Sequence, residues 1–308
     1  MASISAIVSD SAMAAIELKQ VVKTFGEIRA VDGLDLEVRE GICLGLLGPN
    51  GAGKSTTMKL LTAQAIADSG SLRVLGYELP ERSKEARAEM GVVPQLDNLD
   101  IDVTVEDNLR IFSRLYRVKD IDAAVDRALD IARLQDRRKD AVDELSGGMR
   151  RRLLVARGLV HSPKLFLLDE PTVGLDPQIR TEVWDLIEEL RSGGTTILMS
   201  THYIEEAERL ADEVALMAKG KVIARGTPAE LIAEYAGRDT AEVYAPPERR
   251  AEVRRAAEEA GLDVRAAGPA IAIVGAERAT NGVVPDDAVM RPASLEDVFV
   301  LLTGEELE

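Results

Sequence analysis

The stretch that decides the fold is rich in glycine and runs Gly48-Pro49-Asn50-Gly51-Ala52-Gly53-Lys54-Ser55-Thr56. It follows a short apolar run, Cys43–Leu47, typical of a buried central strand, and it opens a stretch with helical spacing, Ser55–Ala67. Glycines let successive backbone N–H groups point at phosphate oxygens, and the N-terminus of the following helix favours anions. In this pattern Lys54 reaches the β- and γ-phosphates, and the Ser55 hydroxyl is a ligand of Mg²⁺. The stretch therefore predicts a phosphate-binding loop for a nucleotide.

A second apolar run ends in two acids, Leu165-Phe166-Leu167-Leu168-Asp169-Glu170. A nucleotide-hydrolysing site needs one acid to hold Mg²⁺ and another group to activate water. We expect Asp169 to serve the metal and Glu170 to orient or deprotonate the water. His202 follows a further strand-like run, Thr196–Thr201, but a lone histidine after a strand is more often structural, and we assign nothing to His161.

The remaining pattern predicts an α/β protein with a mostly parallel sheet, because strand-like and helix-like segments alternate. Two early segments, Ile16–Val22 and Leu34–Val38, alternate as edge or antiparallel strands do. Residues 97–160 form a helical insertion, and Thr104–Gln135 reads as helical throughout.

We expect a flexible tail over residues 1–14, a nucleotide-binding domain over 15–236 and a small α+β accessory domain over 237–308. The accessory domain is expected to contain a strand, Ala270–Val274, and a closing helix, Pro292–Leu302.

Composition limits the partners. The formal net charge of the 308 residues is -16, which argues against nucleic acid and against anionic lipid as the main partner. The single cysteine, Cys43, excludes an internal disulfide and fits a reducing cytoplasm. No apolar stretch approaches the ~20 residues of a membrane helix, and Met1–Ala15 lacks the basic start of a signal peptide. A membrane partner would have to be another chain.

The segment Leu145-Ser146-Gly147-Gly148-Met149 gives the class. Together with the phosphate loop, Asp169-Glu170 and His202, it resembles the ATP-binding cassette (ABC) family from about Ile16 to Leu231. The resemblance implies a P-loop NTPase fold with a RecA-like parallel core, an antiparallel β subdomain and a helical insertion. It also implies ATP hydrolysis with Mg²⁺.

The resemblance implies roles for several further residues. Phe25 matches the aromatic residue that stacks on adenine, and Val31 is nearby. Gln95 matches the glutamine that joins the γ-phosphate and metal site to a transmembrane partner, and His202 matches the histidine that contacts the γ-phosphate. Ser146, Gly147 and Gly148 match the loop that binds the ATP of the other subunit, and Asp176 matches a loop that crosses the dimer interface.

The residues themselves also favour a dimer. Ser146-Gly147-Gly148 opens a helical stretch, Met149–Leu159, whose N-terminus is a second anion site without its own phosphate loop. Two such sites per chain predict two chains around two ATP molecules in a head-to-tail C2 homodimer. The family usually has glutamine where this chain has Met149. The run Arg150-Arg151-Arg152 is expected to be, at least in part, a solvated helix face.

Two short motifs resemble a narrower group, the ATPases of daunorubicin/doxorubicin-type and nodulation-type exporters. They are Gln95-Leu96-Asp97-Asn98-Leu99-Asp100 and Ser294-Leu295-Glu296-Asp297-Val298-Phe299. That resemblance implies a separate ABC-2 type membrane permease, a place on the cytoplasmic face of the membrane, and export of a drug or another amphiphile, with antibiotic resistance as one outcome. The alternatives are an importer, a lipid or polysaccharide ABC system, a soluble ABC ATPase of repair or translation, and a small-molecule kinase.

Overall fold

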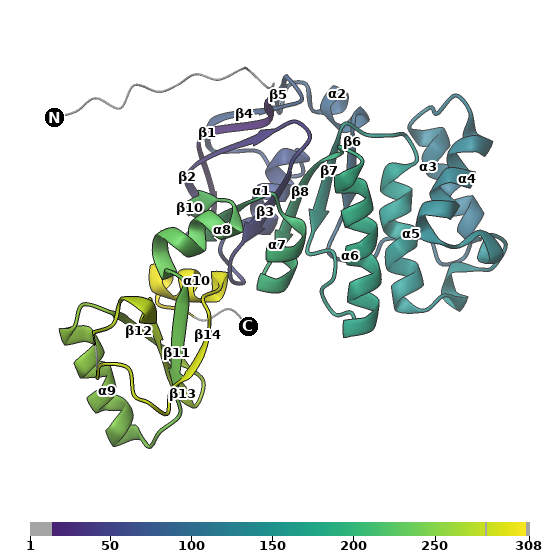
Figure 1. Ribbon diagram of the computed structural model, residues 1–308. Coiled ribbons are helices and arrows are strands. Elements are labelled where there is room, and N and C mark those ends of the chain that lie inside the picture. Colours follow the sequence, from purple (N-terminus) through teal and green to yellow (C-terminus); the bar gives the residue numbers. More distant parts are fainter. Residues whose placement is uncertain (1–13, 281, 306–308) are drawn as a thin grey trace. The chain divides into compact units, whose positions relative to one another are not determined.

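A computed structural model describes residues 14–280 and 282–305 of the chain (Figure 1). The predicted tail, residues 1–14, lies outside these residues except for Ala14, which begins the first strand. The described residues fall into two compact units, one containing residues up to Cys43 and Ser55–Met199, the other containing Leu44–Lys54 and Ser200–Glu308. The chain passes between the units within one helix after Lys54 and within one strand after Met199.

The first unit contains an antiparallel sheet with the order β2-β1-β4-β5 and a group of strands with the order β8-β7-β6. The strands are β1 (Ala14–Phe25), β2 (Ile28–Arg39), β4 (Ser69–Val74), β5 (Tyr77–Leu79), β6 (Met90–Val93), β7 (Leu165–Asp169) and β8 (Thr196–Thr201). Strands β6 and β7 pair in parallel, as the alternating pattern predicted for the core.

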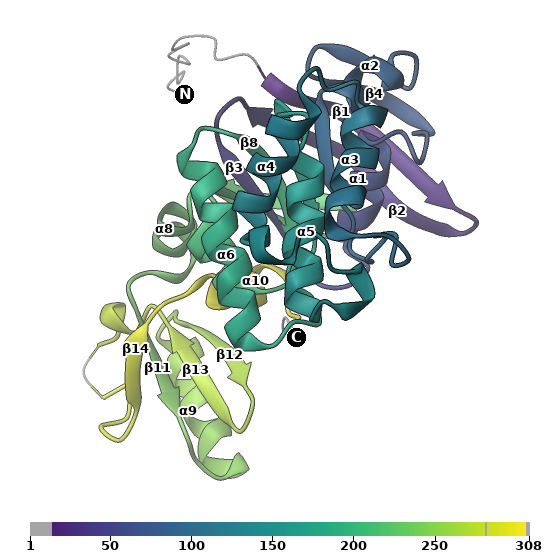
Figure 2. The same cartoon turned by 90° about the vertical axis from the view of Figure 1, so that its right-hand side faces the viewer.

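The helices of this unit include a helical region in which α3, α4 and α5 lie side by side (Figure 2). The bounds are α1 (Lys54–Leu61), α2 (Ser83–Ala88), α3 (Val105–Leu115), α4 (Ile121–Ala132), α5 (Gly147–Leu159) and α6 (Pro177–Ser192). The prediction that Thr104–Gln135 is helical throughout is wrong, because α3 ends at Leu115 and is capped at its C-terminal end by Tyr116. Arg117 has φ +55° there, and the Asp120 side chain accepts from Ala123 N to cap a new helix.

The second unit contains β3 (Cys43–Leu47), which pairs in parallel with β9 (Glu213–Ala218), and β9 pairs antiparallel with β10 (Lys221–Gly226). Every residue of β3 is buried, as its continuous apolar run predicted. The helices α7 (Ile204–Leu210) and α8 (Pro228–Leu231) follow β8 and β10 in the chain, and a π-helical turn, Ile232–Ala236, extends α8.

The end of the chain forms a four-stranded antiparallel sheet with the order β12-β13-β11-β14, and α9 lies on one face of it (Figure 1). The elements are β11 (Asp239–Val243), α9 (Pro247–Glu259), β12 (Asp263–Ala267), β13 (Ala270–Val274), β14 (Val289–Pro292) and α10 (Leu295–Thr303). The predicted domain boundary at 236/237 remains a prediction, and β11 begins at Asp239.

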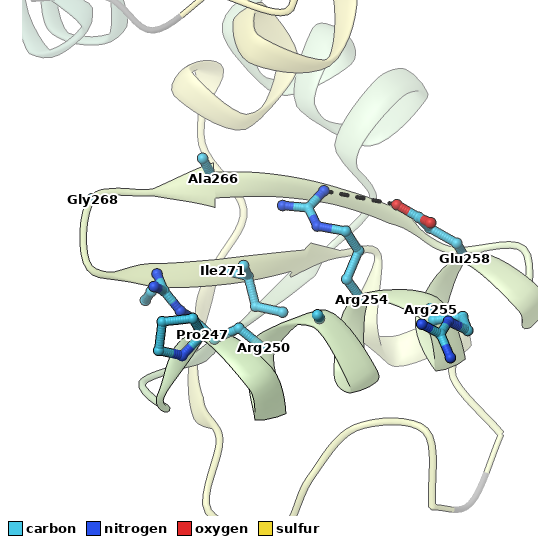
Figure 3. A pocket seen from close by; sticks show the side chains of 10 residues that line it. Pro247, Arg250, Arg254, Arg255, Glu258, Ala266, Gly268 and Ile271 are labelled. Carbon is cyan, nitrogen blue, oxygen red and sulfur yellow. Dashed lines mark ion pairs between the residues drawn. The ribbon is translucent and has the colours of Figure 1, made fainter.

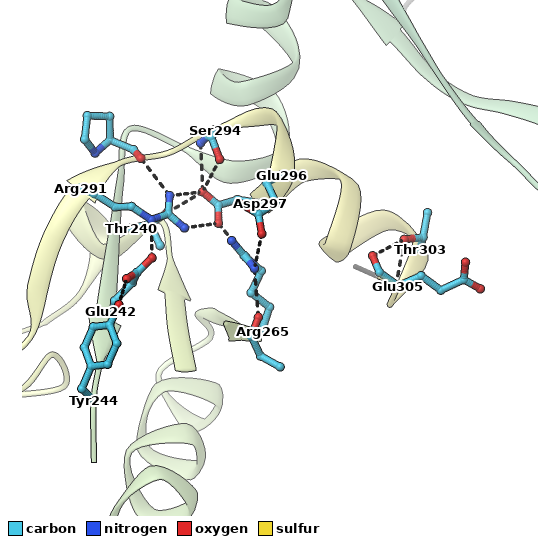
Figure 4. Close-up of polar contacts among 12 residues, drawn as sticks. Thr240, Glu242, Tyr244, Arg265, Arg291, Ser294, Glu296, Asp297, Thr303 and Glu305 are labelled. Carbon is cyan, nitrogen blue, oxygen red and sulfur yellow. Dashed lines mark hydrogen bonds and ion pairs between the residues drawn. The ribbon is translucent and has the colours of Figure 1, made fainter. Parts of the chain in front are cut away.

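The last helix, α10, packs into the same core as the strand before the phosphate loop. Phe299 and Leu295 are buried in a cluster that also contains Leu47 of β3 and Leu216 of β9, all within the second unit. Opposite this core, Asp297 at the start of α10 accepts hydrogen bonds from Arg265 of β12 and Arg291 of β14 (Figure 4). The helix is therefore joined to the terminal sheet by buried charges, and its apolar side chains belong to the same core as the strand before the phosphate loop.

Candidate functional site

The glycine-rich loop joins β3 to α1, and three of its glycines are required by the backbone. A Cβ on Gly48 would lie 2.2 Å from the carbonyl oxygen of Met217, so no side chain fits there. Gly51 and Gly53 have φ values of +84° and +105°, which L residues rarely adopt. Between them, Ala52 is buried and its carbonyl accepts from Gly220 N at 2.9 Å. The sequence thus folds into a tight loop with Pro49, Asn50 and Gly51 at its accessible part.

Lys54 turns its side chain back onto this loop. Its Nζ donates to the carbonyl oxygens of Gly48 at 2.7 Å and Pro49 at 3.1 Å, and the residue is 4 % exposed. Phosphate oxygens carry full charge and are stronger acceptors than carbonyls. The ammonium is therefore held where a nucleotide phosphate on the loop could replace these carbonyls as its hydrogen-bond acceptor.

His202 is tied to the same loop within the second unit. The backbone N–H of Gly48 donates to the carbonyl of Thr201 at 3.3 Å, which brings the next residue, His202, beside the first residue of the loop. The imidazole is 9 % exposed and lies 4.2 Å from the ring of Tyr203. A buried histidine beside the loop fits a phosphate-contacting role better than a histidine on a solvated turn would.

The two acids predicted from sequence lie at the end of β7, in the first unit. The Ser55 hydroxyl donates to Asp169 Oδ1 at 3.3 Å, and the Gln95 side-chain amide donates to Glu170 Oε2 at 2.9 Å. The three residues expected at the metal, Ser55, Gln95 and Asp169, line one pocket of about 220 Å³. The structure thus brings together the predicted hydroxyl, amide and carboxylate ligands.

These groups fit Mg²⁺ better than a transition metal. Mg²⁺ prefers oxygen ligands, keeps several waters and uses few carboxylates together with substrate phosphates. Among residues 14–280 and 282–305, no cluster of three or more His, Cys, Asp or Glu side chains is placed to hold a metal by itself. A nucleotide phosphate would complete the coordination of a Mg²⁺ ion held by Ser55 and Asp169.

Glu170 has the most unusual backbone of the site. It is 4 % exposed and has φ +45°, in the left-handed region that residues other than glycine avoid. Such strain persists only where the surroundings enforce it, and it is concentrated at functional sites. The strained turn directs a buried carboxylate at Gln95 instead of into solvent.

The predicted signature loop forms the N-terminus of α5. Ser146 caps the helix, since its hydroxyl oxygen accepts from Met149 N at 3.3 Å. A Cβ on Gly148 would lie 2.4 Å from Ile179 Cγ2 of α6, so this glycine permits close helix packing. Gly147 is exposed, and a Cβ there would meet nothing within 4 Å. Asp176, at the start of α6, is exposed as well.

Of the two residues expected near adenine, only Phe25 presents a surface. It ends β1, is 49 % exposed, and has the ammonium of Lys23 at 5.2 Å from its ring centroid. Val31 is fully buried in β2, where it pairs with Lys23. Thr56, at the start of α1, is half-buried.

The run Arg150-Arg151-Arg152 was expected to be, at least in part, a solvated helix face; Arg150 and Arg152 are partly exposed, but Arg151 is buried. The residue is 8 % exposed, and its guanidinium donates to backbone carbonyls at the ends of β6 and β7. The signal was present in the sequence, because Gly148, Arg151 and Val155 recur at the spacing of one helix face. The two arginines that flank Arg151 hide this periodicity, because three consecutive arginines are typical of a solvated face.

A larger hollow lies in the terminal sheet region, between α9 and the β12–β13 hairpin, and contains none of the predicted site residues (Figure 3). Two of its arginines bond to backbone carbonyls, Arg250 to Pro269 at 2.8 Å and Arg254 to Val264 at 3.2 Å. These arginines fasten α9 to the hairpin, which explains their position without a ligand.

Comparisons with known proteins identify the family of the chain. The pattern of the family described as ABC transporter matches residues 31–173. The chain is 44 % identical over 307 residues to a Nod factor export ATP-binding protein I of Cupriavidus metallidurans, covering 96 % of this chain and 99 % of that one. It is 42 % identical over 303 residues to the protein of the same name from Rhizobium meliloti, covering 96 % and 89 %.

Two solved structures are similar over the cassette. The cbiO1 protein of Clostridium perfringens, part of the ABC transporter complex cbiONQ, is 27 % identical with a TM-score of 0.65, covering 72 % of this chain and 91 % of that one. A dimeric ATP-binding cassette in a post-hydrolysis state bound to ADP and phosphate is 26 % identical with a TM-score of 0.61, covering 69 % and 98 %.

The chain therefore belongs to the ABC transporter family, as a nucleotide-binding ATP hydrolase with the P-loop NTPase fold. Within that family it is the ATPase subunit of an exporter, and the importer alternative is no better supported by these relatives. ATPases of this family typically dimerise and pair with transmembrane subunits. In the part of the chain that the structure describes, no helix is long and apolar enough to cross a membrane.

Proposed function

We propose that the chain works as half of an ATP-driven motor, with each ATP held by the phosphate loop of one copy and the signature loop of a second copy. The observation that carries this proposal is Gly147. It is exposed at the N-terminus of α5, and among the described residues no atom outside its own helix backbone and its two chain neighbours comes within 4 Å of an added Cβ. The adjacent Gly148 has an internal packing reason, but Gly147 has none. A glycine kept open at a helix N-terminus suits the close approach of an anion from another molecule.

In this proposal each copy supplies the chemistry for the ATP on its own phosphate loop. Lys54 and His202 contact the γ-phosphate, and Phe25 stacks on adenine. Ser55 and Asp169 hold Mg²⁺, with Gln95 as a further ligand. Glu170 orients the attacking water and accepts its proton, and Gln95 holds that carboxylate at 2.9 Å until substrate arrives. Head-to-tail pairing gives a C2 homodimer with two such sites.

The membrane partner is proposed to be a separate ABC-2 type permease. Segment 96–115, which follows Gln95 in the chain, exposes four large apolar side chains, which is unusual for a surface that always faces water. They are Leu96 (79 % exposed), Ile101 (51 %), Ile111 (44 %) and Leu115 (69 %). A permease segment docked there would sense Gln95 directly. In this proposal the chain lies on the cytoplasmic face of the membrane.

The cargo is proposed to be an amphiphile. The relatives carry the name Nod factor export ATP-binding protein I, and the exporter ATPases that the two short motifs resemble also include those of drug exporters. Nucleic acid is not an expected partner, because the net charge of -16 opposes binding to a phosphate backbone.

The test is Glu170→Gln. This change removes the base but keeps the size and a hydrogen-bonding side chain. We expect kcat for ATP to fall by about 10²–10⁴-fold and an ATP-bound dimer to accumulate in size-exclusion chromatography. The matched control is Glu81→Gln, an exposed glutamate between β5 and α2, which should hydrolyse ATP as the wild type does. Normal turnover by Glu170→Gln would refute the role given to Glu170.

A further inference from the structure

One buried guanidinium bonds to the backbone on both sides of the catalytic pair. Arg151 Nη1 donates to the carbonyls of Pro94 at 2.9 Å and Gln95 at 3.2 Å, at the end of β6. Its Nη2 donates to the carbonyl of Glu170 at 3.1 Å, and its Nε donates to that of Pro171, at the end of β7. The backbones of Gln95 and Glu170, whose side chains are bonded to each other, are therefore held by the same side chain.

This arrangement bears directly on the strained residue. Glu170 has φ +45°, and the bond from Arg151 to its carbonyl is one of the contacts that fix this conformation. The peptide orientation at Glu170 sets where its carboxylate points. A side chain that holds this peptide therefore positions the carboxylate without touching it.

Arginine suits this position because its planar guanidinium presents several N–H donors in a fixed fork. Lysine has a single ammonium, which cannot reach four carbonyls on two segments at once. The neighbouring arginines are used differently, since Arg150 Nε donates to Leu145 O at 3.1 Å and Arg152 forms an ion pair with Glu182 of α6. Among the three, only Arg151 bonds to the ends of β6 and β7.

The position of Arg151 on α5 also connects it to the signature loop. Helix α5 begins at the signature loop, and Arg151 lies just over one turn from Gly147 on the same rigid element. A shift of α5 therefore moves the donors that hold Gln95 and Glu170.

We propose that Arg151 is a positioning residue that couples the signature loop to the catalytic pair of the same chain. When the ATP of the partner copy engages Ser146–Gly148, α5 moves and Arg151 resets the backbone at Glu170. Hydrolysis at one site then depends on engagement at the other. This inference rests on the two-site motor proposed above and adds the residue through which its two sites communicate.

The test compares Arg151→Lys with Arg150→Lys, a control on the same helix that reaches only the Leu145 carbonyl. We expect Arg151→Lys to lower kcat by about 10–100-fold, because small misplacements of a catalytic group are costly. Binding of a fluorescent ATP analogue should remain within about twofold of wild type, since the carbonyls that Arg151 holds, at the ends of β6 and β7, lie outside the phosphate loop. Arg150→Lys should keep wild-type kcat and affinity.

Two results would overturn the inference. One is a variant with a lower Tm but wild-type kcat per ATP-binding site, which would make Arg151 a structural residue only. The other is additivity with Glu170→Gln, because a residue that acts by placing the Glu170 carboxylate should lose most of its effect on kcat once that carboxylate is removed. If Arg151→Lys folds poorly, kcat per ATP-binding site is measured for Arg151→Gln instead, with the same titration of binding sites. The same fall in kcat is expected for that variant.

The outcome for the motor is separable. If Glu170→Gln accumulates the ATP-bound dimer and Arg151→Lys turns over normally, only the coupling role fails. If Glu170→Gln hydrolyses ATP normally, the motor proposal fails whatever Arg151 does.

Discussion

At the scale of single residues, adjacent glycines of the signature loop are present for different reasons. Gly148 is buried and leaves room for Ile179, whereas Gly147 is exposed and, in the part of the chain that the structure describes, packs against no other segment. A motif comparison treats the two alike, because it records identity and not environment. Substitution at each position separates the packing requirement from the ligand requirement.

We predict that Gly148→Ala and Gly147→Ala fail in different ways. An added methyl at Gly148 would lie 2.4 Å from Ile179 Cγ2, and relieving such overlap costs about 1–3 kcal/mol of unfolding free energy. The same methyl at Gly147 meets no atom, so stability should change by less than about 1 kcal/mol. Urea unfolding measures both values.

Activity should show the complementary pattern for Gly147→Ala. Its methyl would project where the partner's nucleotide is proposed to bind, so ATPase activity should fall while the fold remains intact. Wild-type activity in that variant would remove the observation on which the dimer proposal rests.

Sequence reasoning at this scale succeeded where residue type and spacing determine the chemistry. It placed Ser55 and Asp169 at one metal site, the family resemblance added Gln95, and these three residues line one pocket; their roles at the metal stay predictions. It did not predict the left-handed backbone of Glu170, nor the burial of Arg151. Both depend on how the ends of β6 and β7 meet α5, which no local pattern records.

At the scale of elements, strands were easier to predict than helix limits. The fully buried runs Cys43–Leu47 and Ala270–Val274 became β3 and β13 with those bounds, because a continuous apolar run has sharp ends. The closing helix was expected over Pro292–Leu302 and spans Leu295–Thr303, since Ser294 and Asp297 form a capping box at its start. The sequence pattern did not predict the break between α3 and α4, because apolar positions occur on both sides of it.

The capping residue of α10 provides a pH-dependent prediction. Burial disfavours the charged form of Asp297, but hydrogen bonds from Arg291 and Arg265 outweigh it and lower the pKa of Asp297 to about 2. A carboxyl group whose pKa is lowered on folding stabilises the protein above its unfolded pKa of ~3.9, and this contribution is lost as the pH falls towards 2. Figure 4 shows the two arginines converging on this carboxylate.

We therefore predict that Asp297→Asn lowers the free energy of unfolding by about 3 kcal/mol at pH 7, the low end of the cost of breaking a buried ion pair. The low end applies because Glu296 remains 3.2 Å from Arg265, which is 3 % exposed. Urea unfolding of both proteins between about pH 5 and 2.5 should show the difference shrinking as Asp297 of the wild type takes up its proton. A difference that is constant over this range would contradict the lowered pKa.

At the scale of the whole molecule, the dominant property is charge. Each chain carries -16, and the proposed dimer must bring two such chains together around two ATP molecules. Like charges on approaching surfaces oppose association, and salt screens them over a Debye length of ~10 Å at 0.1 M.

We predict that ATP-dependent dimerisation of Glu170→Gln becomes tighter as KCl rises from about 50 to 300 mM, because screening reduces the repulsion between chains. Sedimentation analysis at a series of protein concentrations gives the dimer dissociation constant at each salt level. The same series in NaCl distinguishes screening from a specific effect of potassium. Weaker dimers at higher salt would indicate that complementary charges across the interface dominate instead.

The core that holds both β3 and α10 has a consequence for how the protein is made. Leu47 precedes the phosphate loop near the start of the chain, and Phe299 lies in its last helix, yet both belong to one buried cluster. A nascent chain on the ribosome therefore carries the phosphate loop long before it carries the helix that completes the packing beneath it. This core is therefore completed only once α10 has been synthesised, and a chain that stops before α10 would leave the cluster around Leu47 open to solvent and to proteases.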